Sequence, residues 1–166
     1  MTLTRTHVFC IALAVVVPVS TAADSATATI AVSATVRRNC TITTAPLGFG
    51  SYDPVVAHAT TPLDATATLT IACTMGTPAR IGLDGGSNAV ASQRRLANSS
   101  SAYMNYQMFL DSSYATVWGS ETTNQLDAGT APSKVPRDFP VYGRIPAGQD
   151  VPIGPFNDSV VATVNF

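Results

Sequence analysis

Residues 65–73 read Ala-Thr-Ala-Thr-Leu-Thr-Ile-Ala-Cys, and this stretch decides the fold class of the chain. Leu69, Ile71 and Cys73 alternate with mostly polar residues, so an extended backbone places the apolar side chains on one face. A period of two is typical of a strand that is half buried. The stretch therefore predicts a β-strand with one face against a core.

The same alternation recurs along the chain between residues that favour turns. Further strands are predicted at 78–84, 103–110, 139–145 and 159–166, with a glycine turn after the first of them at Asp84-Gly85-Gly86-Ser87. No segment of ten or more residues keeps a helical period of apolar positions. Short strands separated by turns predict an all-β sandwich with two long loops, at 87–102 and 121–138.

The first 23 residues carry the pattern of an export signal. Arg5 precedes an apolar run from Val8 to Val19, and small residues follow it up to Ala23, where cleavage is predicted. The run is too short to anchor the protein in a bilayer. The chain of 166 residues is therefore expected to be exported and to fold as one domain.

Cysteine usage fits an oxidising compartment. Cleavage after Ala23 removes Cys10 and leaves Cys40 and Cys73, and an even pair there predicts a disulfide. A metal site is the alternative, but His58 is the only histidine that remains and the chain has no Cys-x-x-Cys motif. No metal and no cofactor are expected.

Charged residues make up only 11% of the sequence, and the net charge is −1. No basic face is available to neutralise phosphates, so a nucleic-acid partner is not expected. The doublets Arg37-Arg38 and Arg94-Arg95 are each interpreted as a solvated strand end or loop.

The residues of catalytic type do not form a recognisable catalytic set. His58 lies in a loop-like stretch without a partner, and Asp84, Asp111 and Asp127 fit surface turns better than a pair of glycosidase carboxylates. Trp118 is predicted to lie in the core. The chain is therefore not expected to be an enzyme.

A second alternating stretch, Ala-Thr-Ala-Thr-Ile-Ala-Val-Ser-Ala-Thr-Val at 26–36, precedes the first cysteine of the mature chain. Its apolar residues share one parity and hence one face of a strand. The strand either pairs within its own domain or is donated to the sheet of another molecule. The residues that would point into such a sheet are Ala28, Ile30, Val32, Ala34 and Val36.

The last predicted strand runs to the end of the sequence, with one face formed by Val160, Ala162, Val164 and Phe166. No further strand follows to close a sandwich at this edge. The strand is therefore expected to be one wall of a groove that lacks a strand.

Motifs in the order of the chain resemble the spore coat protein U domain family, which includes pilins of archaic chaperone-usher pili. The motifs that carry the resemblance are Cys40-Thr-Ile, Leu47-Gly-Phe-Gly-Ser-Tyr-Asp53, Ile71-Ala-Cys-Thr-Met-Gly76, Ile81-Gly-Leu-Asp-Gly-Gly86, Arg94-Arg-Leu96, Met104-Asn-Tyr106, Trp118-Gly119, Val141-Tyr-Gly-Arg-Ile-Pro146 and Asp158-Ser-Val160.

The resemblance implies an incomplete immunoglobulin-like β-sandwich at 37–166 and an N-terminal donor strand at 24–36. A strand of a periplasmic chaperone would fill the groove first, and the extension of the next pilus subunit would replace it at an outer-membrane usher. The expected role is a structural subunit of a surface pilus that serves adhesion and biofilm formation. The alternative is a self-contained secreted β-sandwich that binds carbohydrate or another ligand through its long loops.

Overall fold

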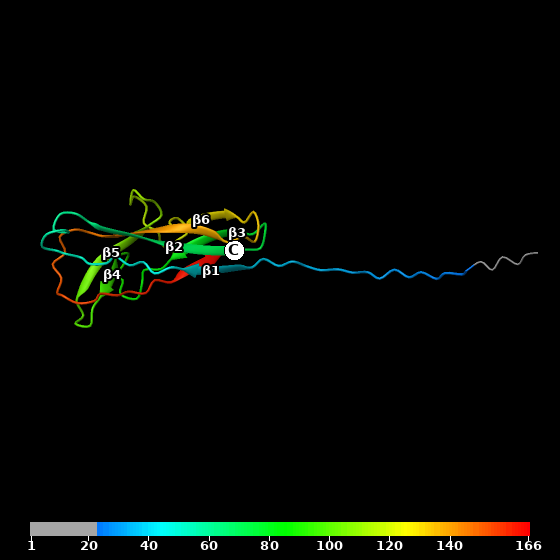
Figure 1. Ribbon diagram of the computed structural model, residues 1–166, viewed down its shortest axis with the longest axis horizontal. Coiled ribbons are helices and arrows are strands. Elements are labelled where there is room, and N and C mark those ends of the chain that lie inside the picture. Colours follow the sequence, from blue (N-terminus) through cyan, green and yellow to red (C-terminus); the bar gives the residue numbers. More distant parts are fainter. Residues whose placement is uncertain (1–22) are drawn as a thin grey trace, which may run out of the picture. The chain divides into compact units, whose positions relative to one another are not determined.

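The computed structural model describes residues 23–166, and its folded domain at 36–166 is built from β-strands (Figure 1). Within the described part there is no helix long and apolar enough to cross a membrane. The signal segment predicted at 1–23 lies outside the described residues, except for Ala23. The strands are β1 (Cys40–Thr44), β2 (Leu63–Cys73), β3 (Pro78–Leu83), β4 (Arg94–Ala97), β5 (Tyr103–Phe109), β6 (Leu126–Thr130), β7 (Arg137–Ile145) and β8 (Ala162–Asn165).

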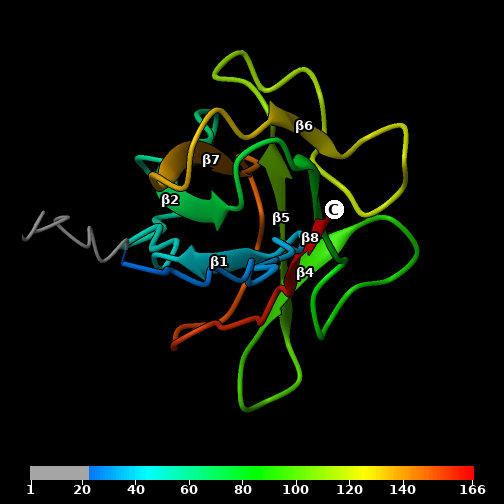
Figure 2. The ribbon, with the colours of Figure 1, turned by 90° about the vertical axis from the view of Figure 1, so that its right-hand side faces the viewer.

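The strands form two antiparallel sheets. One has the order β1-β2-β7-β5-β4 and the other the order β6-β3-β8 (Figure 2). The longest ladder joins β2 to β7, from Leu63 opposite Ile145 to Ile71 opposite Arg137. Each of the five stretches predicted as strands within 65–166 overlaps one of the observed strands, which confirms the all-β sandwich.

The core lies between the two sheets and contains the residues that alternate inward from β2 and β3. Leu69, Ile71 and Ile81 are completely buried. Trp118 is completely buried as well, and its indole N–H donates to the carbonyl of Ile81 at 2.8 Å. Trp118 is therefore a core residue, as its sequence context predicted.

Two segments that were predicted to be long loops each contain a strand. The 87–102 segment contains β4, which pairs with β5, and the 121–138 segment contains β6, which pairs with β3. Both strands are short, and β6 includes Gly129 at φ +64° next to a bulge in the ladder. Too few alternating residues are present for a period of two to be seen in the sequence.

The interpretation of Arg94 as a solvated residue is wrong. Its side chain is only 3% exposed, whereas Arg95 is half buried and Arg37 and Arg38 are exposed. The guanidinium group of Arg94 donates to the carbonyls of Leu83, Asp84 and Trp118 at 2.6–3.1 Å. Backbone carbonyls accept most of the hydrogen bonds of this buried charge. A sequence pattern does not show where carbonyl groups meet in the fold, so the burial of Arg94 could not be predicted.

Residues 23–39 have no regular secondary structure, and their side chains are exposed. The strand predicted at 26–36 is therefore not formed in this structure. A single extended segment becomes a strand only when a neighbour supplies hydrogen bonds to its backbone.

Candidate functional site

Each of the two sheets ends in a strand with one free edge. Among the described strands, β1 pairs only with β2, and β8 pairs only with β3. Side chains next to both strands, including Leu47, Val160 and Ala162, line a shared hollow between the sheets. The candidate site is this groove between β1 and β8, defined by Thr44–Phe49 on one side and Asp158–Val164 on the other.

Alternate backbone groups of β1 point into the groove. The N–H of Ala45 donates to the carbonyl of Thr68 at 2.8 Å, and the N–H of Thr74 donates to the carbonyl of Asn39 at 2.9 Å. Bonded residues alternate in an antiparallel ladder, so the odd-numbered residues of β1 face β2. The backbone groups of Cys40, Ile42 and Thr44 consequently face the free edge.

The same alternation holds on the other side of the groove. The N–H of Asp84 donates to the carbonyl of Val161 at 3.0 Å, which makes these two residues a hydrogen-bonded pair. Residues 163 and 165 follow the same rule, so the backbone groups of Val160, Ala162 and Val164 face away from β3. Two rows of free backbone donors and acceptors therefore face the groove. Cα atoms of β1 and β8 approach within 8 Å, so an inserted strand, which would hold its two neighbours about 9.6 Å apart, would have to separate them slightly.

The interior of the groove is apolar. One hollow of about 310 Å³ is lined mainly by core side chains, among them Leu69, Met108 and Val141. A second hollow of about 660 Å³ continues it toward Met104 and Phe156. Both hollows are lined by Leu47, Phe49, Leu96 and Asp158, so they adjoin each other along the core, and we call them together the trough.

Gly143 in β7 allows one wall of the groove to approach the core. A Cβ atom at this position would overlap the side chains of Leu47 and Phe49, which pack directly against the glycine backbone. Phe49 also meets the ring of Tyr106 edge to face, with the ring centroids 6.1 Å apart. The Leu47-Gly-Phe49 motif therefore forms a wall that depends on a glycine almost a hundred residues away in the sequence.

A polar cluster lies beside the apolar groove. The hydroxyl of Tyr106 donates to Asp158 Oδ2 at 2.7 Å, and burial together with this bond raises the pKa of Tyr106. Asp84 Oδ1 accepts from the N–H groups of Gly86 and Val161, both at 2.9 Å. Gly86 has φ +83°, and a Cβ there would overlap Asp158. These contacts hold the start of the 158–164 wall against β3 and β5.

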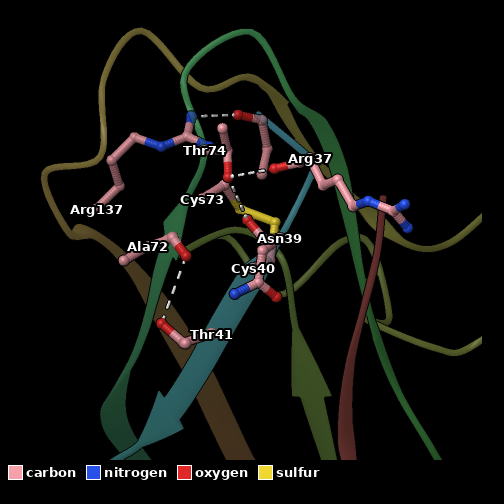
Figure 3. Close-up of a disulfide and its surroundings, with 9 residues drawn as sticks. Arg37, Asn39, Cys40, Thr41, Ala72, Cys73, Thr74 and Arg137 are labelled. Atoms are coloured by element: carbon pink, nitrogen blue, oxygen red, sulfur yellow. Dashed lines mark hydrogen bonds between the residues drawn. A yellow bond between two sulfur atoms is a disulfide. The ribbon is translucent and has the colours of Figure 1, made fainter. Parts of the chain in front are cut away.

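The disulfide fixes the other wall. Cys40 and Cys73 are bonded to each other and lie opposite in the β1–β2 ladder, with their Cα atoms 4.1 Å apart (Figure 3). Thr74 lies beside them and donates from Oγ1 to the carbonyl of Arg37 at 3.2 Å. Because the bridge ties β1 to a central strand, the free edge of β1 is held in place.

The residues predicted to form the acceptor wall fall on β8 and its approach. Val160, Ala162 and Val164 are half buried and pack against the core, whereas Phe166 is 50% exposed. Of the residues predicted to be donated, Ala28 and Ala34 are exposed, and Ile30, Val32 and Val36 are 82–90% exposed. The sequence did not predict that Leu47, Phe49 and Gly143 contribute to the groove, although Leu47-Gly-Phe49 is part of a motif that carries the family resemblance.

His58, which was considered as a catalytic base, contacts the backbone of Asp53 and the ring of Tyr52. His58 Nδ1 accepts a hydrogen bond from the N–H of Asp53 at 2.9 Å, and its ring stacks on Tyr52. Asp53 accepts bonds from the N–H groups of Val55 and Val56, and these bonds lower its pKa. No group of three His, Cys, Asp or Glu side chains at metal-binding distance occurs among residues 23–166.

A model of the Spore Coat Protein U domain matches residues 26–163. The chain belongs to this family. Protein U of Myxococcus xanthus is 36% identical over 129 residues, which cover 72% of this chain and 71% of that protein.

A solved structure supports the fold assignment. It is the CsuC-CsuE chaperone-tip adhesion subunit pre-assembly complex from archaic chaperone-usher Csu pili of Acinetobacter baumannii, matched with a TM-score of 0.58 at 20% identity. The match covers 80% of this chain but only 41% of the length of that chain. The likeness concerns the fold, and it agrees with the incomplete immunoglobulin-like sandwich expected from the sequence.

Proposed function

We propose that this member of the Spore Coat Protein U family is a structural subunit of a bacterial surface pilus assembled by strand donation. The observation that carries the proposal is the groove between β1 and β8, which offers an apolar trough and two rows of free backbone groups. The family assignment and the fold shared with a chain from a chaperone-usher complex support it.

The N-terminal segment has the chemistry that this groove requires. An extended strand at 26–36 would place Ala28, Ile30, Val32, Ala34 and Val36 in the apolar trough and its threonines and serine toward solvent. Fully burying a Val or Ile contributes about 1.5–3 kcal/mol, and each backbone hydrogen bond adds on the order of 1 kcal/mol. Ordering the segment opposes these gains, at roughly 1–2 kcal/mol per residue.

The proposal includes the partners and the location that strand donation needs. A periplasmic chaperone would fill the groove of a newly exported subunit, and an outer-membrane usher would exchange that strand for residues 24–36 of another subunit. Residues 1–23 would serve as the export signal and residues 37–166 as the acceptor domain. The resulting fibre at the cell surface would serve adhesion and biofilm formation.

Ile30→Asp tests the proposal at one donor position. The variant would bury an unpaired carboxylate in the trough, so we expect no detergent-resistant ladder of subunits on unboiled gels. The matched control is Ser33→Asp, which adds the same charge on the opposite face of the strand. That control is expected to form ladders like the wild type.

Deleting residues 24–36 completes the test. The deletion variant is expected to remain monomeric while its groove still accepts a chaperone strand. Wild-type ladders from Ile30→Asp would refute Ile30 as an anchor. Ladders from the deletion variant, or a stable wild-type monomer that never forms them, would refute donation and favour the self-contained sandwich.

A further inference from the structure

The two ends of the domain differ, and the ladders define them. Cys40 lies opposite Cys73 in the β1–β2 ladder, and Arg137 lies opposite Ile71 in the β2–β7 ladder, so the segments 36–40, 73–78 and 131–137 meet at one end. We call it the disulfide end. Leu63 and Ile145 lie opposite each other at the far end of β2 and β7. The segments 50–62 and 146–156 next to them form the loop end, where the N–H of Gly148 donates to the carbonyl of His58 (Figure 1).

Positive charge gathers at the disulfide end. Its three segments contain Arg37, Arg38, Lys134 and Arg137 and no Asp or Glu. Arg37, Arg38 and Lys134 are exposed, while Arg137 donates to the carbonyl of Ala128 at 2.6 Å. The nearest carboxylate in the sequence is Asp138, which accepts a hydrogen bond from Thr70 on the surface of the sheet.

Negative charge gathers at the loop end. Its two segments contain Asp53 and Asp150 and no Lys or Arg. The backbone hydrogen bonds that lower the pKa of Asp53 keep it ionised, and the side chain of Asp150 is exposed. The next charged residues along the chain are Asp64 and Arg144, which pair with each other at 2.7 Å, and Asp158, which accepts a hydrogen bond from Tyr106. Arg95 lies near this end as well, opposite Asn105, whose N–H donates to Gln149, and it stacks over Tyr103. The two segments of the loop end therefore carry a net negative charge, and the three segments of the disulfide end carry a net positive charge.

Both ends also carry apolar side chains in contact with solvent. Val55, Val56 and Ile153 are 77–100% exposed at the loop end, and Met75 and Val135 are 63–72% exposed at the disulfide end. An apolar centre with charged residues around it is the composition of a surface that docks on another protein.

The length of the connection decides which ends meet if strands are donated as proposed above. From Val36 to Cys40 the chain spans at most about 14 Å, so the disulfide end of a donor must adjoin the end of the groove where Val36 emerges. If Val36 emerged at the acceptor's disulfide end, two basic ends would meet. The donor would then also block the N-terminal segment that the acceptor itself must donate. Emergence at the loop end joins unlike charges and leaves the acceptor free to extend the chain.

We propose that the basic disulfide end of one subunit docks on the acidic loop end of a second copy of this chain. Arg37 and Arg38 of the donor pair with Asp53 and Asp150 of the acceptor, and the exposed apolar side chains of the two ends are buried between them. This contact steers the donated strand, which runs parallel to β1, into the groove in the direction that allows a filament to grow.

Charge reversal in the full mature chain tests the contact. The rate at which detergent-resistant ladders form is measured at about 0.05 M and about 0.5 M NaCl, where the Debye length is about 14 Å and about 4 Å. We expect the double variant R37E/R38E to form ladders about tenfold more slowly at low salt and at the wild-type rate at high salt. Asp150→Arg is expected to slow assembly severalfold, and combining it with R37E/R38E is expected to recover part of the lost rate.

Glu121→Arg is the matched control for Asp150→Arg, because it makes the same charge change in an exposed loop beside Gly82 of β3, outside the segments that define the two ends. It is expected to form ladders at the wild-type rate. A salt-independent rate for R37E/R38E equal to that of the wild type, or an equal loss in Glu121→Arg, would overturn the docking contact. A wild-type chain that does not assemble with itself would overturn it too.

The deletion of residues 24–36 separates the two proposals. Ladders from the deletion variant would refute strand donation itself. If the deletion abolishes the ladders and the charge reversals have no effect, strand donation stands and only the end-to-end contact fails.

Discussion

Arg94 ties the polar cluster beside the groove to the core. Its guanidinium group donates to the carbonyls of Leu83, Asp84 and Trp118 and to the side-chain oxygen of Gln107 at 3.1 Å. Burial lowers the pKa of this guanidinium group, which nevertheless remains charged because its starting value is so high. The residue links β3 to the β4–β5 pair, and no backbone ladder among the described strands joins β3 to that pair.

Arg94→Met is expected to destabilise the domain by about 2–4 kcal/mol, because three buried carbonyls lose their donors. The neighbouring Arg95 is a matched control, since it is only half buried, bonds to the carbonyl of Asn88 and stacks over Tyr103 at 4.0 Å. Arg95→Met is expected to cost about 1 kcal/mol or less. Urea titrations of the two variants measure the difference, and equal losses would contradict the role of Arg94.

Asp111 makes stability depend on pH in the acid range. Hydrogen bonds from the Ser113 hydroxyl and from the N–H groups of Ala115 and Thr116 lower its pKa from 3.8 to about 2. Because the folded state has the lower pKa, the stabilisation is complete above pH 3.8 and is lost as the pH falls through about 2. In urea titrations from pH 5 to about 2, Asp111→Asn is expected to lose less stability than the wild type. Parallel pH profiles would contradict this assignment.

Among the elements, β1 and β8 are edge strands, as β4 and β6 are, but the free edges of β1 and β8 face a shared groove. The disulfide holds β1 against β2, and the bonds between Asp84 and Val161 hold the approach to β8 against β3. Each strand is therefore held to its own sheet. The free edges therefore persist until another strand covers them.

Hydrogen exchange should show this alternation residue by residue. In the monomer, the amides of Ile42, Thr44 and Ala162 are expected to exchange fast, while those of Thr43 and Thr163 are protected by β2 and β3. Strand insertion is expected to slow the first group by on the order of 100-fold and to change the second group little. Quenched exchange read by NMR on monomer and polymer measures both groups. Equal protection of neighbouring amides in the monomer would mean that the edges are already covered.

At the scale of the molecule, the domain combines two ends of opposite charge with a groove between β1 and β8 that lacks a strand. In the proposed assembly, a second strand fills the groove, and the charges of the two ends set the direction from which that strand comes. Groove and ends make separate contributions, since apolar burial determines how long a joint lasts while charge mainly affects how fast it forms. A filament subunit needs both properties in one domain.

Much of the fold could be predicted because alternation in β2 and β3 is long enough to be seen. Leu69, Ile71 and Ile81 were expected inside and are completely buried. β4 and β6 could not be predicted, because four or five residues with charges or a glycine carry too little periodicity. Of the groove, Val160, Ala162 and Val164 on the β8 side were predicted from the sequence and stay a prediction as an acceptor wall, whereas Leu47, Phe49 and Gly143 on the opposite side were not predicted.

The sequence by itself determined the fold class, the two cysteines available for a bridge and the alternating segment at 26–36, because each depends on neighbours along the chain. Only the tertiary structure decided that Gly143 makes room for Leu47 and Phe49, that Arg94 is buried and that the two free edges face a common groove. The physical reason is that these features depend on contacts between residues far apart in sequence. A period of two records which face a side chain takes, and it does not record which strand will lie opposite.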